Sequence, residues 1–240
     1  MKPLSGWHAT AQGLLDLLLP PRCVVCDRTG GWLCSTCVEQ IEFVRPPVCP
    51  LCGLSTSLPQ RCPSCLHRPL RIDGIRAVGY LEGALQTAIH RFKYSNLRPL
   101  AVPLGKLASD YLTRNHLPID TVVPVPLHSR RLRERGYNQA ALLAEEIGRA
   151  VEVTVVDDVL RRMKSTIPQV GLSAVQRRKN VRGAFQCTDT SLRERNVLLV
   201  DDVSTTGATM ESCSIALRDA GVSVVWGLAL AREKWHESEV

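Results

Sequence analysis

Hydrophobic and polar positions follow two alternating periods from about residue 72 onward. Short apolar runs, typical of strands buried on both faces of a sheet, alternate with stretches whose apolar residues recur at helical spacing. Strands are predicted at residues 75–80, 122–125, 153–160, 196–202 and 222–231. Helices are predicted at residues 84–92, 100–112, 138–150 and 210–220. Strands that alternate with helices favour a parallel sheet with flanking helices, so we expect an α/β domain.

The first 70 residues do not show this alternation. Residues 1–20 predict a short amphipathic helix that packs on the segment after it. Residues 21–70 are rich in Cys, Pro and Gly and poor in periodic apolar positions, so a bound metal is expected to replace a hydrophobic core. We therefore predict two domains, a small cysteine-rich module at 1–70 and the α/β domain at 71–240.

Eight of the ten cysteines lie before residue 66 in four Cys-x-x-Cys pairs. The pairs are Cys23/Cys26, Cys34/Cys37, Cys49/Cys52 and Cys62/Cys65. Two such pairs complete a tetrahedral thiolate site, which predicts two structural Zn²⁺ ions. The chain order favours tandem sites made from the first two pairs and the last two pairs, although cross-braced pairing has the same counts. A disulfide framework is less favoured because the sequence begins without a secretory signal.

Composition argues against a membrane-spanning protein and gives little support to nucleic-acid binding. The chain has 240 residues, 45% of them hydrophobic, and no apolar run approaches the roughly 20 residues that span a bilayer. We therefore expect a cytoplasmic protein without a membrane span. Eight thiolates and two Zn²⁺ ions together lower the formal charge of +7 by four, to about +3, so overall basicity is weak evidence for nucleic-acid binding.

Residues 197–209 form the most informative segment. Four apolar residues, 197–200, are followed directly by Asp201 and Asp202. A turn of small and hydroxylated residues around Gly207 then leads into a predicted helix. Backbone N–H groups at a helix start bind phosphate, and carboxylates accept hydrogen bonds from sugar hydroxyls. A ribose 5-phosphate would satisfy both halves of this site.

Other classes with an acidic or glycine-rich turn fit less well. A receiver domain needs more βα units than the residues after Asp202 provide, and a Walker loop needs a Lys after its glycine. A dinucleotide fold needs three spaced glycines. A purely structural acidic turn remains the alternative.

Two basic segments follow other predicted strands. Residues 124–139 hold Arg130, Arg131, Arg133 and Arg135 against the single acid Glu134, which suits a pyrophosphate group. The alternative is a solvated basic helix start. Residues 161–182 hold seven positive residues and no acid, which is typical of a functional or disordered loop.

The segment around Asp201 resembles the 5-phosphoribosyl-1-pyrophosphate (PRPP) motif of type I phosphoribosyltransferases, with Asp201, Asp202, Thr206, Gly207 and Thr209 at its positions. With the cysteine-rich start, the whole chain resembles the ComF/GntX family. The further matching segments are residues 17–26, Lys93-Tyr94, residues 123–128 and 133–140, Gln169 and residues 177–185.

The resemblance implies roles for these residues. Type I phosphoribosyltransferases have a flexible catalytic loop that closes over PRPP at the place of residues 161–182, so the candidates there to touch substrate are Arg162, Lys164, Thr166, Gln169 and Arg177. Asp201 and Asp202 would bind the ribose hydroxyls, and both would act in catalysis with Arg162 and Lys164. The 5-phosphate would lie on Ser204, Thr205, Thr206, Gly207, Ala208 and Thr209. The pyrophosphate would lie on His128, Ser129, Arg130 and Arg131, with Mg²⁺ held mainly by PRPP oxygens and water.

The expected function is the transfer or sensing of phosphoribosyl groups in nucleotide metabolism or DNA uptake, with a nucleobase as an acceptor class. The alternative is a zinc-ribbon competence factor that binds single-stranded DNA beside a non-catalytic PRPP-like pocket and acts with the DNA-uptake machinery. Few aromatic residues interleave with the basic ones, which disfavours a base-stacking surface. The acceptor and the oligomeric state are not indicated by the sequence.

Overall fold

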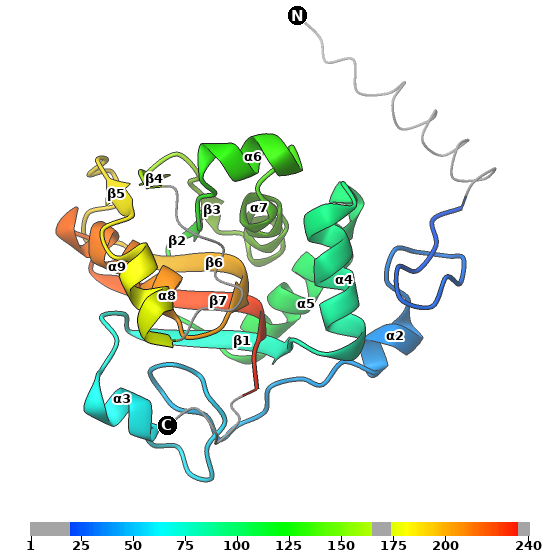
Figure 1. Cartoon of the computed structure of the whole chain (residues 1–240), viewed down its shortest axis with the longest axis horizontal. Coiled ribbons are helices and arrows are strands. Elements are labelled where there is room, and N and C mark those ends of the chain that lie inside the picture. The colour runs from blue at the N-terminus through cyan, green and yellow to red at the C-terminus, as the bar shows by residue number, and fades with distance from the viewer. Residues whose placement is uncertain (1–19, 165–173, 235–240) are drawn as a thin grey trace, which may run out of the picture.

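A five-stranded parallel sheet forms the centre of the computed structural model, which describes residues 20–164 and 174–234 (Figure 1). Its strands lie in the order β1-β7-β6-β2-β3. They are β1 (Gly74–Tyr80), β2 (Thr121–Pro124), β3 (Thr154–Val155), β6 (Asn196–Ser204) and β7 (Val224–Arg232). Every pairing in this sheet is parallel, so the predicted α/β class is confirmed. The helix predicted at residues 1–20 lies outside the described residues.

Strand β6 is the central strand and carries the site at its carboxyl end. Its residues Val197 to Val200 are at most 1% exposed, because helices cover both faces of the sheet. Backbone bonds join β6 to β7 on one side and to β2 on the other. The uninterrupted apolar run in the sequence is thus a doubly covered strand, as predicted.

Two groups of helices pack in two hydrophobic clusters. One cluster contains α4 (Gly83–Tyr94), α5 (Ala101–Arg114) and α7 (Gln139–Val151), with the short 3₁₀ helix η1 (Arg98–Leu100) between the first two. The other contains α9 (Ala208–Asp219) and the end of α8 (Ala174–Val181). None of the helices in the described part of the chain has the length and hydropathy needed to cross a bilayer.

The predicted strand at residues 153–160 is wrong. Only β3 joins the sheet, and the chain then turns away through the exposed residues Asp157 and Asp158. Next, β4 (Leu160–Arg162) pairs in antiparallel fashion with β5 (Phe185–Cys187) as a separate two-stranded sheet. The exposed acidic pair explains the break, because charged side chains cannot continue a buried strand.

The two segments expected to be loops contain short helices. Helix α6 (Ser129–Arg135) lies within 124–139, and α8 lies within 161–182. No residue of α6 is buried, and Val181 is the buried end of α8. Neither helix has the broad apolar face that a sequence pattern can reveal.

The cysteine-rich module packs on both clusters and along the edge of the sheet. Its first half, with α2 (Ser35–Glu39), packs with the α4 cluster, and its second half, with α3 (Pro63–His67), packs with the α9 cluster. The connection between them covers the edge strand β1, since Val44 N–H donates to the Val78 carbonyl at 3.0 Å. The module therefore caps a sheet edge that would otherwise be open to pairing.

Candidate functional site

Two carboxylates lie where β6 leaves the sheet. Asp202 is buried, and its backbone N–H donates to Oδ1 of Asp201 at 2.9 Å. The pKa of Asp201 is raised to about 7, chiefly by burial and next by the adjacent Asp202, while the charges of Lys93 and Arg162 oppose the rise. The pair therefore concentrates hydrogen-bond acceptors at one point of the site.

The turn after β6 is fixed by Gly207. This residue has φ of +75° and precedes the first residue of α9. A Cβ atom there would lie 2.6 Å from Cδ1 of Ile75, so both the backbone conformation and the packing require glycine. A small hollow at the start of α9 is lined by Asp201, Val203, Ser204, Thr205, Gly207, Ala208, Thr209 and Met210. The first N–H groups of a helix have no intrahelical acceptor, so this hollow suits an anion.

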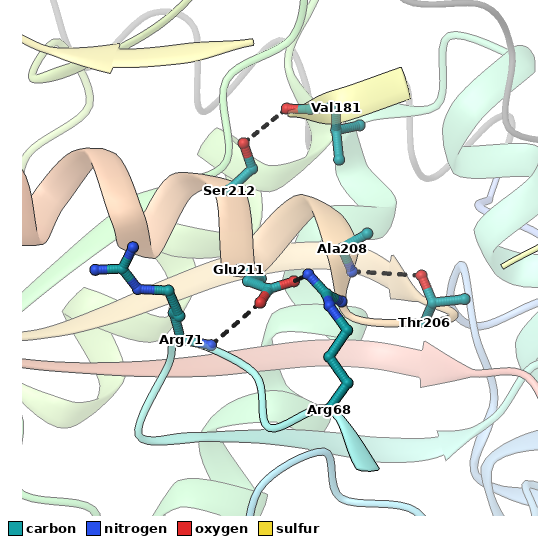
Figure 2. A network of polar contacts seen from close by, with 7 residues as sticks. All are labelled: Arg68, Arg71, Val181, Thr206, Ala208, Glu211 and Ser212. Atoms are coloured by element: carbon teal, nitrogen blue, oxygen red, sulfur yellow. Dashed lines mark hydrogen bonds and ion pairs between the residues drawn. The ribbon is translucent and has the colours of Figure 1, made fainter. Parts of the chain in front are cut away.

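Figure 2 shows the polar contacts that hold the first turn of α9 in place. The buried Glu211 carboxylate accepts from the backbone N–H of Arg71 at 3.2 Å and from the Arg68 side chain at 3.5 Å. Ser212 donates to the Val181 carbonyl of α8 at 2.7 Å. The start of α9 is therefore tied both to the chain leaving the second cysteine site and to α8.

A cavity of about 720 Å³ lies in front of the acidic pair. It brings together six of the predicted site residues: Asp201, Asp202, Thr205, Thr209, Arg131 and Arg162. The substrate-loop candidate Arg177 also lines it, paired with Glu233 at 3.0 Å. Burial lowers the pKa of the Arg162 guanidinium, with a contribution from Arg131, so these two cations lie close enough to repel each other.

The other predicted residues lie elsewhere. His128 caps α6, with Nδ1 accepting from the N–H of Arg130 at 3.2 Å, and Ser129 is the first residue of that helix. Arg130 is exposed and pairs with Glu134 at 2.9 Å. Neither Thr206 nor the exposed Lys164 is among the residues that line the cavity or the hollow. Thr166 and Gln169 lie outside the described residues.

The sequence pattern missed a cation in direct contact with the acidic pair. Lys93 Nζ lies 2.7 Å from Oδ1 of Asp202, and both side chains are largely buried. Lys93 is the penultimate residue of α4, far from the PRPP-like motif in the chain. Spacing could not reveal the contact, and only the family resemblance of the Lys93-Tyr94 pair marked the position.

The eight paired cysteines form two tandem groups. They are Cys23, Cys26, Cys34 and Cys37, and Cys49, Cys52, Cys62 and Cys65, with the sulfur atoms of each group within 4.8 Å of one another. Tetrahedral zinc with Zn–S bonds of about 2.3 Å places sulfurs about 3.8 Å apart. The 3.6 Å separations of Cys26 from Cys34 and of Cys52 from Cys62 fit this arrangement and are too long for disulfides.

The chemistry of the thiols also fits a cation. Burial, together with the charges of Cys52 and Cys49, raises the pKa of Cys62 to about 11. Four thiolates at such distances repel one another, and a divalent cation removes that cost. The two groups are therefore consistent with two structural Zn²⁺ ions, and the tandem grouping is the one that the structure has.

Together the fold and these sites define a class, an α/β protein with a double zinc ribbon packed on its parallel sheet. Residues 14–66 match the double zinc ribbon domain family. Over 88% of the chain the sequence is 37% identical to competence protein F of Haemophilus influenzae and 32% identical to the DNA utilization protein YhgH of Escherichia coli K12. These matches cover 97% and 98% of the two relatives. The chain belongs to the ComF/YhgH family, as its motifs predict.

Solved structures with a similar arrangement are more distant. A glutamine PRPP amidotransferase from Bacillus subtilis, complexed with ADP and GMP, is 16% identical with a TM-score of 0.41, over 58% of this chain and 30% of that one. A hypoxanthine phosphoribosyltransferase from Staphylococcus aureus is 16% identical with a TM-score of 0.33, over 58% of this chain and 65% of that one. Both TM-scores are below 0.5, and the fold class rests on the strand order of the chain itself.

Proposed function

We propose that this member of the ComF/YhgH family binds PRPP in the cavity at the carboxyl end of β6 and transfers or senses its phosphoribosyl group. One observation carries the proposal: a single strand end presents two carboxylates to the cavity and an anion-binding helix start to the small hollow, and Thr205 and Thr209 line both. Asp201 and Asp202 accept hydrogen bonds from the ribose hydroxyls, and the residues from Ser204 to Thr209 hold the 5-phosphate.

The arginines that line the cavity support a place for the pyrophosphate. Arg131 and Arg135 from α6 and Arg162 from β4 line the cavity, and guanidinium groups match phosphate oxygens in geometry and charge. In a transfer reaction a nucleophile would displace pyrophosphate from the anomeric carbon. The arginines would then stabilise the negative charge that develops on the leaving group.

Mg²⁺ is the cation expected with this ligand. Oxygen donors suit it, and it retains waters and substrate oxygens rather than requiring an all-protein site. When bound, Mg²⁺ would neutralise charge on the pyrophosphate, and the chain's own residues would orient the ribose.

The test is calorimetric titration of PRPP with Mg²⁺ into the parent and into Asp201→Asn/Asp202→Asn. Each hydrogen bond to a carboxylate is worth about 1.5–3 kcal/mol, so the double variant should bind roughly 10²-fold more weakly or worse. Asp157→Asn/Asp158→Asn changes an exposed pair of adjacent aspartates outside the cavity and is the matched control. Equal affinity in parent and site variant, or equal loss in both variants, contradicts the proposal.

The relatives named for competence and DNA utilization support placing this activity in the handling of DNA or its nucleotides. Single-stranded DNA binding is the second candidate, because four arginines line the cavity: Arg131, Arg135, Arg162 and Arg177. The same variants separate the two functions. Removing the acidic pair leaves DNA binding unchanged or slightly tighter, whereas it weakens PRPP binding.

A further inference from the structure

The ion pair between Lys93 and Asp202 lies inside the proposed ribose site. The 2.7 Å contact joins side chains that are 18% and 11% exposed, so solvent screens it weakly. Only one Asp202 oxygen, Oδ1, is in this contact, which leaves Oδ2 as a possible acceptor for ligand hydroxyls. A lysine in the last turn of α4 also has the favourable sign for the helix C-terminus.

The last turn of α4 is held in position by the chain before α7. The Phe92 carbonyl accepts hydrogen bonds from the Tyr137 hydroxyl and from Nε2 of Gln139 at 3.3 Å. Both donors are buried, with Gln139 only 1% exposed. Because Phe92 precedes Lys93, these bonds fix the point from which the lysine side chain reaches the acidic pair.

A second set of contacts joins the same turn to α6. The Arg135 guanidinium lies 5.2 Å from the centre of the Tyr94 ring and donates to Oε1 of Gln139 at 3.1 Å. Arg98 donates to the Gly136 carbonyl at 2.8 Å. The Arg-Gly-Tyr-Asn-Gln run at 135–139 therefore acts largely as a brace between α4 and α7, a role that its arginine content did not suggest.

We propose that Lys93 is a positioning residue of this site, whose ammonium group holds the Asp202 carboxylate in place and favours the charged state of the acidic pair that the ribose hydroxyls need. This inference rests on the proposed function for its ligand and on the ion pair and brace for its geometry. Two adjacent carboxylates with little exposure repel each other, so one of them would take up a proton without a nearby cation. Lys93 makes an ion pair with one of them.

Other charged groups face the pair from the elements around it. They are Glu134, Arg131 and Arg135 of α6, Arg162 of β4, Arg177 of α8 and Glu233 after β7. His90 and Tyr94 line the same cavity from α4, and the buried thiol of Cys213 approaches from α9. Arg177 is paired with Glu233, and Arg135 is held by Gln139 and Tyr94.

The experiment follows the carboxyl ¹³C signals of Asp201 and Asp202 against pH in the zinc-loaded full chain, assigned with the single Asn variants. A cation at this distance lowers a carboxyl pKa by about 1–3 units. Lys93→Met should therefore raise the titration midpoint of the pair by at least about one pH unit, whereas Lys93→Arg should restore it. Arg91→Met removes an exposed charge from the same turn and should leave the midpoint unchanged.

PRPP affinity in the presence of Mg²⁺ gives the second readout. At pH 7 Lys93→Met should bind about tenfold more weakly or worse, and by pH 9 it should recover most of the parent affinity, which also shows that the variant is folded. Tyr137→Phe keeps the lysine but loosens its brace, so it should shift the midpoint in the same direction by less.

An unchanged midpoint in Lys93→Met overturns the inference whether or not PRPP binds. A loss of affinity that persists at pH 9 also overturns it, since the lysine would then be acting directly on the ligand. If the parent fails to bind PRPP, the proposed function falls, and the carboxyl titration still decides the role of Lys93.

Discussion

At the scale of single residues, the buried acidic pair is suited to ligand binding, but its charged form lowers the stability of the folded protein. The pKa of Asp201 is raised to about 7, chiefly by burial, so its charged form is unfavourable in the folded protein. An unfolded aspartate ionises near pH 3.9. Between these values the unfolded chain has released a proton that the folded chain retains, so rising pH lowers stability.

This predicts a pH-dependent effect of Asp201→Asn on the free energy of unfolding. The contribution of Asp201 is fully present below about pH 4 and is lost as pH rises through about 7. The variant, which cannot ionise, should therefore become progressively more stable relative to the parent from pH 4 to pH 8. Urea unfolding across this range measures it, with Asp157→Asn as the control for loss of a charge. A relative stability that falls with pH would contradict the burial of this carboxyl.

At the scale of elements, the start of α9 depends on a buried carboxylate that no motif contains. Glu211 accepts from the Arg71 N–H and the Arg68 side chain, which connects α9 with the exit from the second zinc ribbon (Figure 2). Glu211→Ala removes the charged acceptor of the partly buried hydrogen bond from the Arg71 N–H, at a cost of about 1–3 kcal/mol. It should also lower PRPP affinity, because the turn at residues 204–209 that is proposed to hold the 5-phosphate (the phosphate turn) would be held less firmly.

The control for this prediction is Glu145→Ala on α7, which removes an exposed glutamate. Urea unfolding and PRPP titration are compared for both variants. If Glu211→Ala matches the control in both measurements, α9 does not need the tether, and the proposed support of the phosphate turn is wrong.

The same scale shows how much the sequence could predict. Strands β1, β2, β6 and β7 and helices α4, α5, α7 and α9 follow the predicted ranges within a few residues, because each buries a periodic apolar face. Helix α6 and the β4–β5 pair were missed because they bury few residues. In the site, the acidic pair and the glycine turn are contiguous in sequence and could be found. Lys93 and the tether of Glu211 to Arg68 and Arg71 could not, since tertiary packing alone brings these residues there.

At the scale of the whole molecule, the second zinc ribbon is part of the support of the sheet. Leu51 accepts from the Ile75 N–H at 2.8 Å, and the buried Arg232 of β7 donates to the Cys52 carbonyl at 2.9 Å. Glu233, next to Arg232, lines the cavity. The domain division at residue 70 stays a prediction. Loss of the second zinc is nevertheless expected to weaken PRPP binding.

The corresponding variants are Cys49→Ser in the second group and Cys26→Ser in the first. Each should lower the zinc content from about two ions per chain to about one, since each removes one of four thiolates. Cys49→Ser should weaken PRPP binding more, because the second ribbon packs in the cluster that contains α9, whereas the first packs in the cluster that contains α4. Elemental analysis and calorimetry measure both effects. Equal affinities in the two variants would show that the second ribbon does not support the site.

The most direct measurement of the central claim is a crystal structure of the zinc-loaded protein with PRPP and Mg²⁺. The 5-phosphate is predicted on the backbone N–H groups between Ser204 and Thr209, the ribose hydroxyls on Asp201 and Asp202, and the pyrophosphate toward Arg131. A PRPP molecule bound away from the carboxyl end of β6, or a cavity that stays empty at saturating ligand, would contradict the account.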